Sequence, residues 1–277
     1  MRSKQPAGSC YYCLHRVHDL ISTRVELRGR PAVHEFPAIP DRLSRAFEMQ
    51  VFDYEKYRGF AGYCTGQDVV SEGLHLSSCW EGFDTLLTLA LLDGEGEGLV
   101  VDVGAHIGWY TLLAASCGHH VVAIDADREN LSVLRINASS NGLGHLVETR
   151  NEWIGEGWEA PPIGGPHHEV LFLKSDIEGA ENHLVAGCHD LLEKRAVRYL
   201  LLEVSPTLAP HYADTVAAVM AYGYEAAIVP SKPEPHVREA YEADPILALG
   251  LSRVDPANVR EAVESEAQSN WLFWRSE

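Results

Sequence analysis

From residue 98 onward, short apolar runs alternate along the chain with stretches of helical spacing. Seven runs rich in valine, isoleucine, leucine and aromatic residues have the length of buried strands. They span 98–104, 120–125, 145–150, 169–176, 197–204, 223–229 and 270–275. Helical spacing follows in 109–118, 128–142, 178–187 and 212–223. Strands that alternate with helices are typical of a mostly parallel sheet that is covered by helices on both faces.

Two segments lack this rhythm. Residues 1–95 are predicted to form a mainly helical N-terminal extension, with helices at 41–52 and, more clearly, at 80–94. Residues 230–268 are acidic and contain five prolines, which favours an insertion or a lid. The regular pattern therefore predicts one domain over residues 96–277 that carries this insertion.

Composition narrows the class of protein. The net charge of −18 over 277 residues would repel a phosphate backbone, so nucleic acid is not an expected partner. The longest apolar run, 86–92, is far too short to cross a bilayer, so no membrane association is expected. Because the N-terminus has no apolar core of a secretory signal, we expect a soluble cytoplasmic protein with reduced thiols.

Two thiols and two imidazoles lie close together near the N-terminus, at Cys10, Cys13, His15 and His18. Such a set is able to bind zinc. The spacing is tighter than in an ordinary zinc finger, whose two ligand pairs are about a dozen residues apart. A reduced N-terminal segment without metal is therefore the favoured interpretation.

The sequence VVDVGAHIGWYT, residues 100–111, lies between the first predicted strand and the first helix, where a nucleotide-binding sheet places its ligand loop. Gly104 would allow a sharp turn, and Gly108 would bring the helix close to the strand. Asp125 ends the second strand, which is the usual place for an acid that binds ribose hydroxyls. Asn151, just past the third strand, would lie on the same edge and could reach an adenine.

The spacing of the glycines favours one cofactor. Nicotinamide and flavin sites prefer G-x-G-x-x-G, whereas this turn lacks the middle glycine. Asp102, two residues before Gly104, suits a cofactor that carries an ammonium group, as S-adenosyl-L-methionine does. The candidate cofactor residues are Asp102, Gly104, Ala105, His106, Gly108, Trp109, Tyr110, Asp125 and Asn151. For Trp109 and Tyr110, core packing is an equally good explanation.

VVDVGAHIGWYTLLAA, VVAID, FLKSDIEGAE, LLLEVSP and SNWLFW together resemble the FkbM-type methyltransferase family. The resemblance is strong over residues 98–204 and loose to 275. It implies a Rossmann-like class I methyltransferase fold with a seven-stranded, mostly parallel sheet. The resemblance does not extend over the first 75 or so residues; the N-terminal extension is separately expected to cover the substrate. His106 and Asp125-Ala126 depart from the family, which more often has Asn and Glu-Pro there.

The resemblance also places the fourth and fifth strands side by side, which would bring Asp176 and Glu203 to one edge. When two acids lie close together, the pKa of at least one rises, so one of them could accept a proton near neutral pH. Asp176 is the first choice for a base or for a group that orients the acceptor, with Glu203 as its partner. His211 is an alternative base, although a surface histidine is the commoner outcome.

Four further residues are candidate substrate contacts: Lys174, Glu178, Trp80 and Glu81. Glu178 and Glu181 are expected in the first turn of the following helix, where acids interact favourably with the helix dipole. Asp176 could equally be the N-cap of that helix. A Mg²⁺ site built from these carboxylates is an alternative, but nothing in the sequence fixes a ligand set, and no metal is expected.

The sequence thus predicts an S-adenosylmethionine-dependent methyltransferase that acts on a hydroxyl of a small molecule, such as a natural product, sugar or lipid precursor. A nitrogen or carboxyl acceptor with the same cofactor is a close alternative. A non-catalytic scaffold that keeps the fold is a more distant alternative, and a nicotinamide dehydrogenase is disfavoured by the missing glycine.

Overall fold

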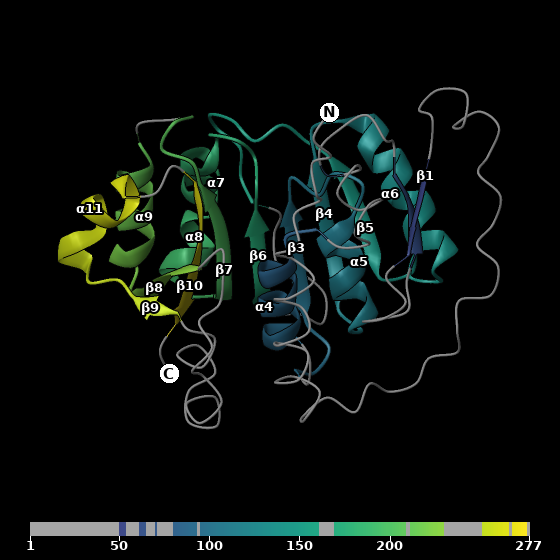
Figure 1. Ribbon diagram of the computed structural model, residues 1–277, viewed down its shortest axis with the longest axis horizontal. Coiled ribbons are helices and arrows are strands. Elements are labelled where there is room, and N and C mark those ends of the chain that lie inside the picture. The colour runs from purple at the N-terminus through teal and green to yellow at the C-terminus, as the bar shows by residue number, and fades with distance from the viewer. Residues whose placement is uncertain are drawn as a thin grey trace, which may run out of the picture.

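A single eight-stranded sheet forms the centre of the protein in a computed structural model (Figure 1). The structure describes residues 50–53, 61–64, 70, 80–92, 95–160, 169–208, 211–229, 251–265 and 268–275. The order in the sheet is β5-β4-β3-β6-β7-β10-β8-β9. Its strands are β3 (Leu99–Val103), β4 (His120–Asp125), β5 (Val147–Asn151), β6 (Val170–Ser175), β7 (Val197–Val204), β8 (Tyr224–Val229), β9 (Ser252–Arg253) and β10 (Ser269–Arg275).

The direction of the strands confirms the predicted fold class. β5, β4, β3, β6 and β7 are parallel, while β10 runs antiparallel between β7 and β8. All seven predicted strands are present, and the two-residue β9 adds an edge strand beside β8. The protein therefore has the Rossmann-like class I methyltransferase fold that the sequence predicts.

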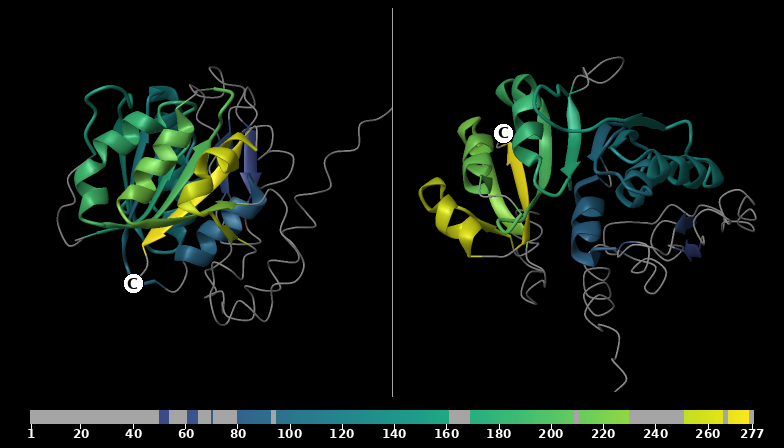
Figure 2. Two further views of the ribbon diagram at one scale, coloured as in Figure 1. Left: turned by 90° about the vertical axis from the view of Figure 1, so that its left-hand side faces the viewer. Right: turned by 90° about the horizontal axis from the view of Figure 1, so that it is seen from above.

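Helices cover both faces of the sheet (Figure 2). They are α4 (Gly82–Leu92), α5 (Trp109–Ser116), α6 (Arg128–Ser140), α7 (Glu181–Gly187), α8 (His189–Glu193), α9 (Tyr212–Ala221) and α11 (Val259–Glu264), with a 3-10 turn at Pro256–Asn258. Helices α4 and α5 pack on the face that contains Val100 and Phe172. Helices α7, α8, α9 and α11 pack on the face that contains Val101 and Leu173.

Local signals explain where several helices begin and end. Asp127 caps α6, because its side chain accepts a hydrogen bond from the Glu129 amide at 2.7 Å. The same helix ends at Asn141, and Gly142 follows with a φ of 71°. The predicted helix at 80–94 is also confirmed, since α4 covers most of it.

Two predictions outside the regular part need correction. The helix predicted over 41–52 is wrong at its end, because Gln50–Asp53 form strand β1, paired antiparallel with β2 (Ala61–Cys64). Strand β2 lies against α6. The predicted insertion is also smaller than expected: Leu251, Val259 and Val263 are buried against the domain, so 251–265 belong to it. The cysteines and histidines at 10–18 lie outside the described residues.

Within the part of the chain that the structure describes, no helix combines the length and the apolar character needed to cross a bilayer.

The turn after β3 is locked against the end of β6. Gly104 has a φ of 78°, and a Cβ placed on it would lie 1.9 Å from the carbonyl oxygen of Asp176. The Asp176 amide in turn donates to the Val103 carbonyl at 3.1 Å. The sequence suggested that Gly108 allows the helix to pack close to the strand. The structure shows a different neighbour: a Cβ on Gly108 would lie 2.8 Å from the Leu134 side chain of α6.

We predict that Gly104→Ala destabilises the protein by about 3 kcal/mol or more, because it combines a left-handed backbone with a clash against main chain. Gly142→Ala is the matched control, since Gly142 also has a positive φ but nothing within 4 Å of the added Cβ. It should cost only about 1 kcal/mol. Urea unfolding measures both, and equal losses would refute the role of the contact with Asp176.

Candidate active site

A cleft of about 730 Å³ opens at the carboxyl edge of the parallel strands, the edge at which open α/β sheets bind ligands. It runs from the end of β4 to the end of β7. The residues that line it are Val70, Trp80, Glu81, Val103, Gly104, His106, Ile124, Asp125, Ala126, Asn130, Glu152, Trp153, Ile154, Asp176, Ile177, Glu178, Ala180, Glu203 and Gln268. Eight of the sixteen residues that the sequence predicts for the site therefore line one cavity.

Asp125 stands at the β4 end of the cleft, as predicted. Its carboxylate is fixed by two backbone amides: Oδ2 accepts from His106 and Oδ1 accepts from Asp127, each at 2.7 Å. Asn151 does not line the cleft. Its side-chain amide instead donates to the carbonyls of Asp125 and Ala126, at 3.0 and 2.8 Å, and so holds the turn after β4 in place.

Some residues of the turn after β3 line the cleft, and others are buried in the core. Gly104 and His106 line the cleft. Ala105 is packed in a small core cluster, while Trp109 donates its indole N–H to Thr85 at 2.8 Å and is buried. Core packing is thus the observed environment of Trp109. A histidine at 106 is compatible with the turn because it contributes its backbone amide to Asp125.

Asp102 lies beneath the cleft rather than in its lining. It is 1% exposed and accepts a 2.6 Å hydrogen bond from the Thr111 hydroxyl. Burial raises the pKa of its carboxyl, while the charge of Lys174 beside it opposes the rise. The structure therefore does not bring the Asp102 carboxylate to the place where it could meet a cofactor ammonium directly.

Asp176 and Glu203 meet at the β7 end of the cleft. Asp176 follows the last residue of β6, Glu203 lies in β7, and the two side chains share a hydrogen bond. Lys174, 5% exposed, forms an ion pair with Asp176 at 3.2 Å from below. The ammonium also lies 4.5 Å from the centre of the Tyr110 ring. Burial would lower the pKa of Lys174, but the surrounding carboxylates raise it, so the lysine is charged.

The pKa values of the two acids are pushed apart. Burial would raise the pKa of Asp176, but the charge of Lys174 and the hydrogen bonds from Glu203 and Lys174 lower it to about 2. Burial, the hydrogen bond to Asp176 and the charge of that residue raise the pKa of Glu203 to about 8. The expectation that one pKa rises therefore applies to Glu203, and Asp176 is its ionised partner.

The neighbours of Glu203 determine which of its oxygens carries the proton. Both Ser205 and Gln268 donate to Oε1, the former at 2.9 Å. An oxygen that accepts two hydrogen bonds is a poor position for a proton. These two hydrogen bonds therefore favour Oε2 as the oxygen that carries a proton. Gln268 lies in the predicted insertion and was not anticipated as a site residue.

Helix α4 contributes a third acid to this end of the cleft. Trp80 and Glu81 precede its first turn and line the cleft, as the sequence suggested. Glu81 accepts a 2.8 Å hydrogen bond from the Tyr110 hydroxyl, so Tyr110 reaches the site only through Glu81. Burial raises the pKa of Glu81, against the lowering effect of Lys174. Behind it, burial and the charge of Glu81 raise the pKa of Asp84 to about 7.

Glu178 and Glu181 have separate roles, and the predicted placement of Glu178 in a helix is wrong. Glu178 is exposed at the cleft with a φ of 51°, three residues before α7 begins. Glu181 is fully buried and accepts hydrogen bonds from the amides of Ile177 and Gly179 and from the Tyr212 hydroxyl, the last at 2.6 Å. Glu181 thus shapes the loop that carries Asp176.

His211 precedes α9 and stacks on the ring of Tyr212, with centroids 5.6 Å apart. It does not line the cleft. Among the described residues its Nε2 is buried without a hydrogen-bond partner. The structure therefore separates His211 from Asp176 and Glu203.

Backbone strain is concentrated at the cleft. Four described non-glycine residues have a positive φ, and three of them, Glu81, His106 and Glu178, line the cleft. Such conformations cost of order 1–3 kcal/mol and cluster at functional sites. Residues that the sequence did not single out complete the wall: Asn130 in the first turn of α6, and Glu152 and Trp153 in the loop after β5, where Trp153 is 78% exposed. Periodicity carries no signal for such positions.

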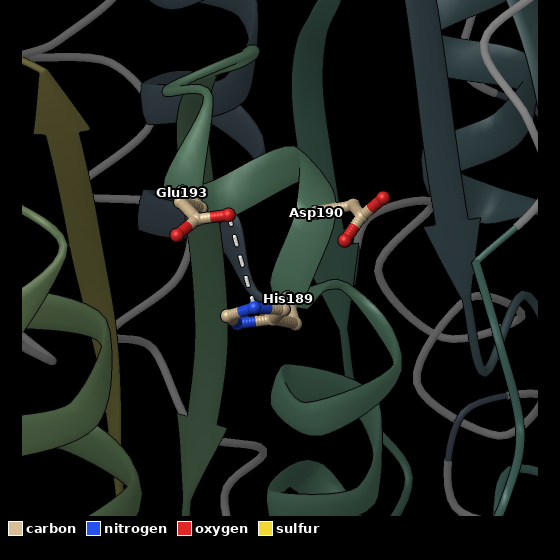
Figure 3. A group of neighbouring side chains, drawn as sticks. All are labelled: His189, Asp190 and Glu193. Carbon is tan, nitrogen blue, oxygen red and sulfur yellow. Dashed lines mark ion pairs between the residues drawn. The ribbon is translucent and has the colours of Figure 1, made fainter.

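The carboxylates of the cleft do not form a compact metal site. Within the described ranges, the one group of three possible ligands is His189, Asp190 and Glu193, exposed on α8 (Figure 3). His189 Nε2 lies 3.8 Å from Glu193 Oε2, and the Asp190 carboxylate lies 3.5 Å from the Lys194 ammonium. Each of these side chains therefore already has a polar partner. None of these three residues lines the cleft, so this group is not part of the site.

We predict that the free energy of unfolding falls between pH 4.5 and pH 8, partly because of Glu203. Its folded-state pKa of about 8 exceeds the ordinary value of 4.5, so in this window the folded protein keeps a proton that the unfolded chain has released. Glu203→Gln, which resembles the protonated acid, should flatten this fall in urea unfolding series. Glu193→Gln, on exposed α8, is the control, and an unchanged slope in Glu203→Gln would contradict the assignment.

No family model matches the chain, and no curated protein matches it. Solved structures with a related arrangement include precorrin-6y C5,15-methyltransferase from Geobacter metallireducens, which is 14% identical, with 69% of this chain and 86% of that chain covered and a TM-score of 0.42. A TehB-like SAM-dependent methyltransferase from Corynebacterium glutamicum is 10% identical, with 74% and 94% covered and a TM-score of 0.43. Human methyltransferase 10 domain containing protein is 11% identical, with 84% and 92% covered and a TM-score of 0.43.

Proposed function

We propose that the protein is an S-adenosylmethionine-dependent methyltransferase that methylates a hydroxyl of a small molecule. The observation that carries the proposal is a single cleft with Asp125 at its β4 end and the Asp176–Glu203 pair at its β7 end. The resemblance of the sequence motifs to the FkbM-type family supports it. The acceptor would be a precursor of a natural product, a glycan or a lipid.

The residues at the β4 end suit the adenosine part of the cofactor. Asp125 is fixed by two backbone amides, yet each carboxylate oxygen keeps a further lone pair that could accept a ribose hydroxyl. The exposed indole of Trp153 lies in the same wall and offers a flat apolar surface to an aromatic base. The cleft volume of about 730 Å³ lies within the range of known ligand pockets.

When bound, S-adenosylmethionine supplies an electrophilic methyl group on a sulfonium. The protein has to align the acceptor hydroxyl with that methyl, exclude water and accept the hydroxyl proton. Asp176, ionised and held by Lys174, is suited to orient the acceptor molecule by accepting a hydrogen bond from it. Glu203, with a pKa of about 8, has a deprotonated fraction near neutral pH that can take the proton.

A carboxyl acceptor is less well supported than a hydroxyl. The β7 end of the cleft contains Glu81, Asp176 and Glu203, and no lysine or arginine is among the described residues that line it. A carboxylate ligand would meet like charges there, which disfavours its binding.

We predict that S-adenosylmethionine and S-adenosylhomocysteine bind the protein with sub-millimolar dissociation constants in isothermal calorimetry. Asp125→Ala should weaken both by about tenfold or more, because it removes the acceptor of the ribose hydroxyls. Asp190→Ala, the same substitution on exposed α8, should bind like the unmodified protein. Absence of binding by well-folded protein would refute the proposed function.

Asp176 and Glu203, at the β7 end, should affect the rate of methyl transfer rather than the binding of the cofactor. We expect Asp176→Asn and Glu203→Gln each to lower the rate of methyl transfer by about a hundredfold, because orientation or proton acceptance is lost. The dissociation constant of the cofactor should change by less than about threefold. Transfer of a radiolabelled methyl group to an accepted substrate measures the first quantity and calorimetry the second; the reverse pattern would reject the assignment of roles.

A further inference from the structure

The β7 end of the cleft has a one-sided charge. Three carboxyl groups come to it from three different elements, namely Glu81 before α4, Asp176 after β6 and Glu203 in β7. Within the described lining there is no lysine or arginine. Among the described residues, Lys174 lies behind this group and is already bound to Asp176, and His106 of the cleft lining also interacts with Asp176.

Lys174 does not balance the acids around it. Four carboxyl groups, those of Asp84, Asp102, Glu81 and Asp176, interact with this single ammonium group. Burial raises the pKa of Glu81 and Asp102, and that of Asp84 to about 7, so these groups hold a negative charge at a free-energy cost. A ligand cation in the cleft would favour their ionised forms and would itself be bound more tightly.

Glu81 is positioned to meet such a cation. Its backbone has a φ of 42°, and the Tyr110 hydroxyl fixes one carboxylate oxygen at 2.8 Å. Trp80, the preceding residue, lines the same cleft. A carboxylate beside an indole is the chemistry that recognises an ammonium group, since the face of tryptophan is the best aromatic partner of a cation.

We propose that the methyl acceptor carries a protonated amine in addition to its hydroxyl, and that Glu81 and Asp176 bind this amine beside Trp80. The acceptor class is thus an amino alcohol, such as an amino sugar or aminocyclitol, and acceptors with a phosphate or carboxylate group are excluded. This inference rests on the proposed methyl transfer to oxygen.

The ammonium group is an anchor rather than the methylated atom. A protonated amine has no lone pair, so it cannot attack a methyl group while it is bound as a cation. The neighbouring hydroxyl keeps its lone pairs and can lose its proton to Glu203. The oxygen–carbon bond then forms as the carbon–sulfur bond breaks, and the proton remains on Glu203 until it is released to water.

An ammonium also fits the site better than a metal ion does. A hard cation requires several oxygen ligands within a short distance of one another. In the part of the chain that the structure describes, no three acidic or histidine ligands of the cleft converge in this way. Three N–H donors that point to separate carboxylates match the more open arrangement of Glu81 and Asp176.

The test uses three compounds that differ in one group: trans-2-aminocyclohexanol, cyclohexane-1,2-diol and 2-hydroxycyclohexanecarboxylate. Ligand-observed NMR titrations of the full chain, with and without S-adenosylhomocysteine, give the dissociation constants at pH 7.5. We expect the amino alcohol to bind at least about tenfold more tightly than the diol, and the carboxylate to bind most weakly. Glu81→Gln should remove this preference, whereas Glu193→Gln, with the same change in net charge, should keep it.

Equal binding of the three compounds, tighter binding of the carboxylate, or no binding of the amine up to about 50 mM would overturn the inference. A preference that survives in Glu81→Gln would do so as well. If S-adenosylhomocysteine binds but the amine is not preferred, this inference fails and the proposed function stands. If the amine binds through Glu81 but neither cofactor form binds, the proposed function fails instead.

Discussion

The site depends on one buried ion pair, between Lys174 in the central strand β6 and Asp176 just after it. An unpaired ammonium or carboxylate at this depth would be strongly destabilising, but each group makes the other tolerable. Because Lys174 keeps Asp176 ionised, Glu203 can remain protonated beside it and donate its proton to it. The division of the two acids into an orienting group and a proton-holding group therefore originates in a lysine that the cleft does not expose.

The sheet places these groups without any help from long loops. Parallel strands end at one edge, so Asp125, Asp176 and Glu203, which are distant in sequence, share a cavity. The segments around the cleft are less relaxed: His106 and Glu178, in turns that follow strands, and Glu81, just before α4, are held in left-handed backbone conformations. The packed sheet below supplies the stability that makes such conformations sustainable.

Much of the fold and part of the site could be predicted from sequence. Six of the seven predicted strands are dense apolar runs, and the ends of such runs locate Gly104, Asp125, Asp176 and Glu203. The rest depends on non-local contacts. The strand at Gln50–Asp53 exists because it pairs with Ala61–Cys64, and the two residues of β9 are too few to produce a pattern. Gln268 and Glu181 act through hydrogen bonds to partners that no spacing rule reveals.

The contact between Gly104 and the Asp176 carbonyl joins two motifs that look independent along the chain. One turn faces the proposed cofactor and the other carries the proposed acceptor chemistry, yet they share a single steric boundary. Neither turn could change independently during evolution. A bulkier residue at position 104 would displace the Asp176 carbonyl, and a displaced carbonyl would leave a void beside Gly104. In a chimera that takes only one of these segments from a relative, the two turns would no longer pack correctly against each other. The two segments are therefore best exchanged together.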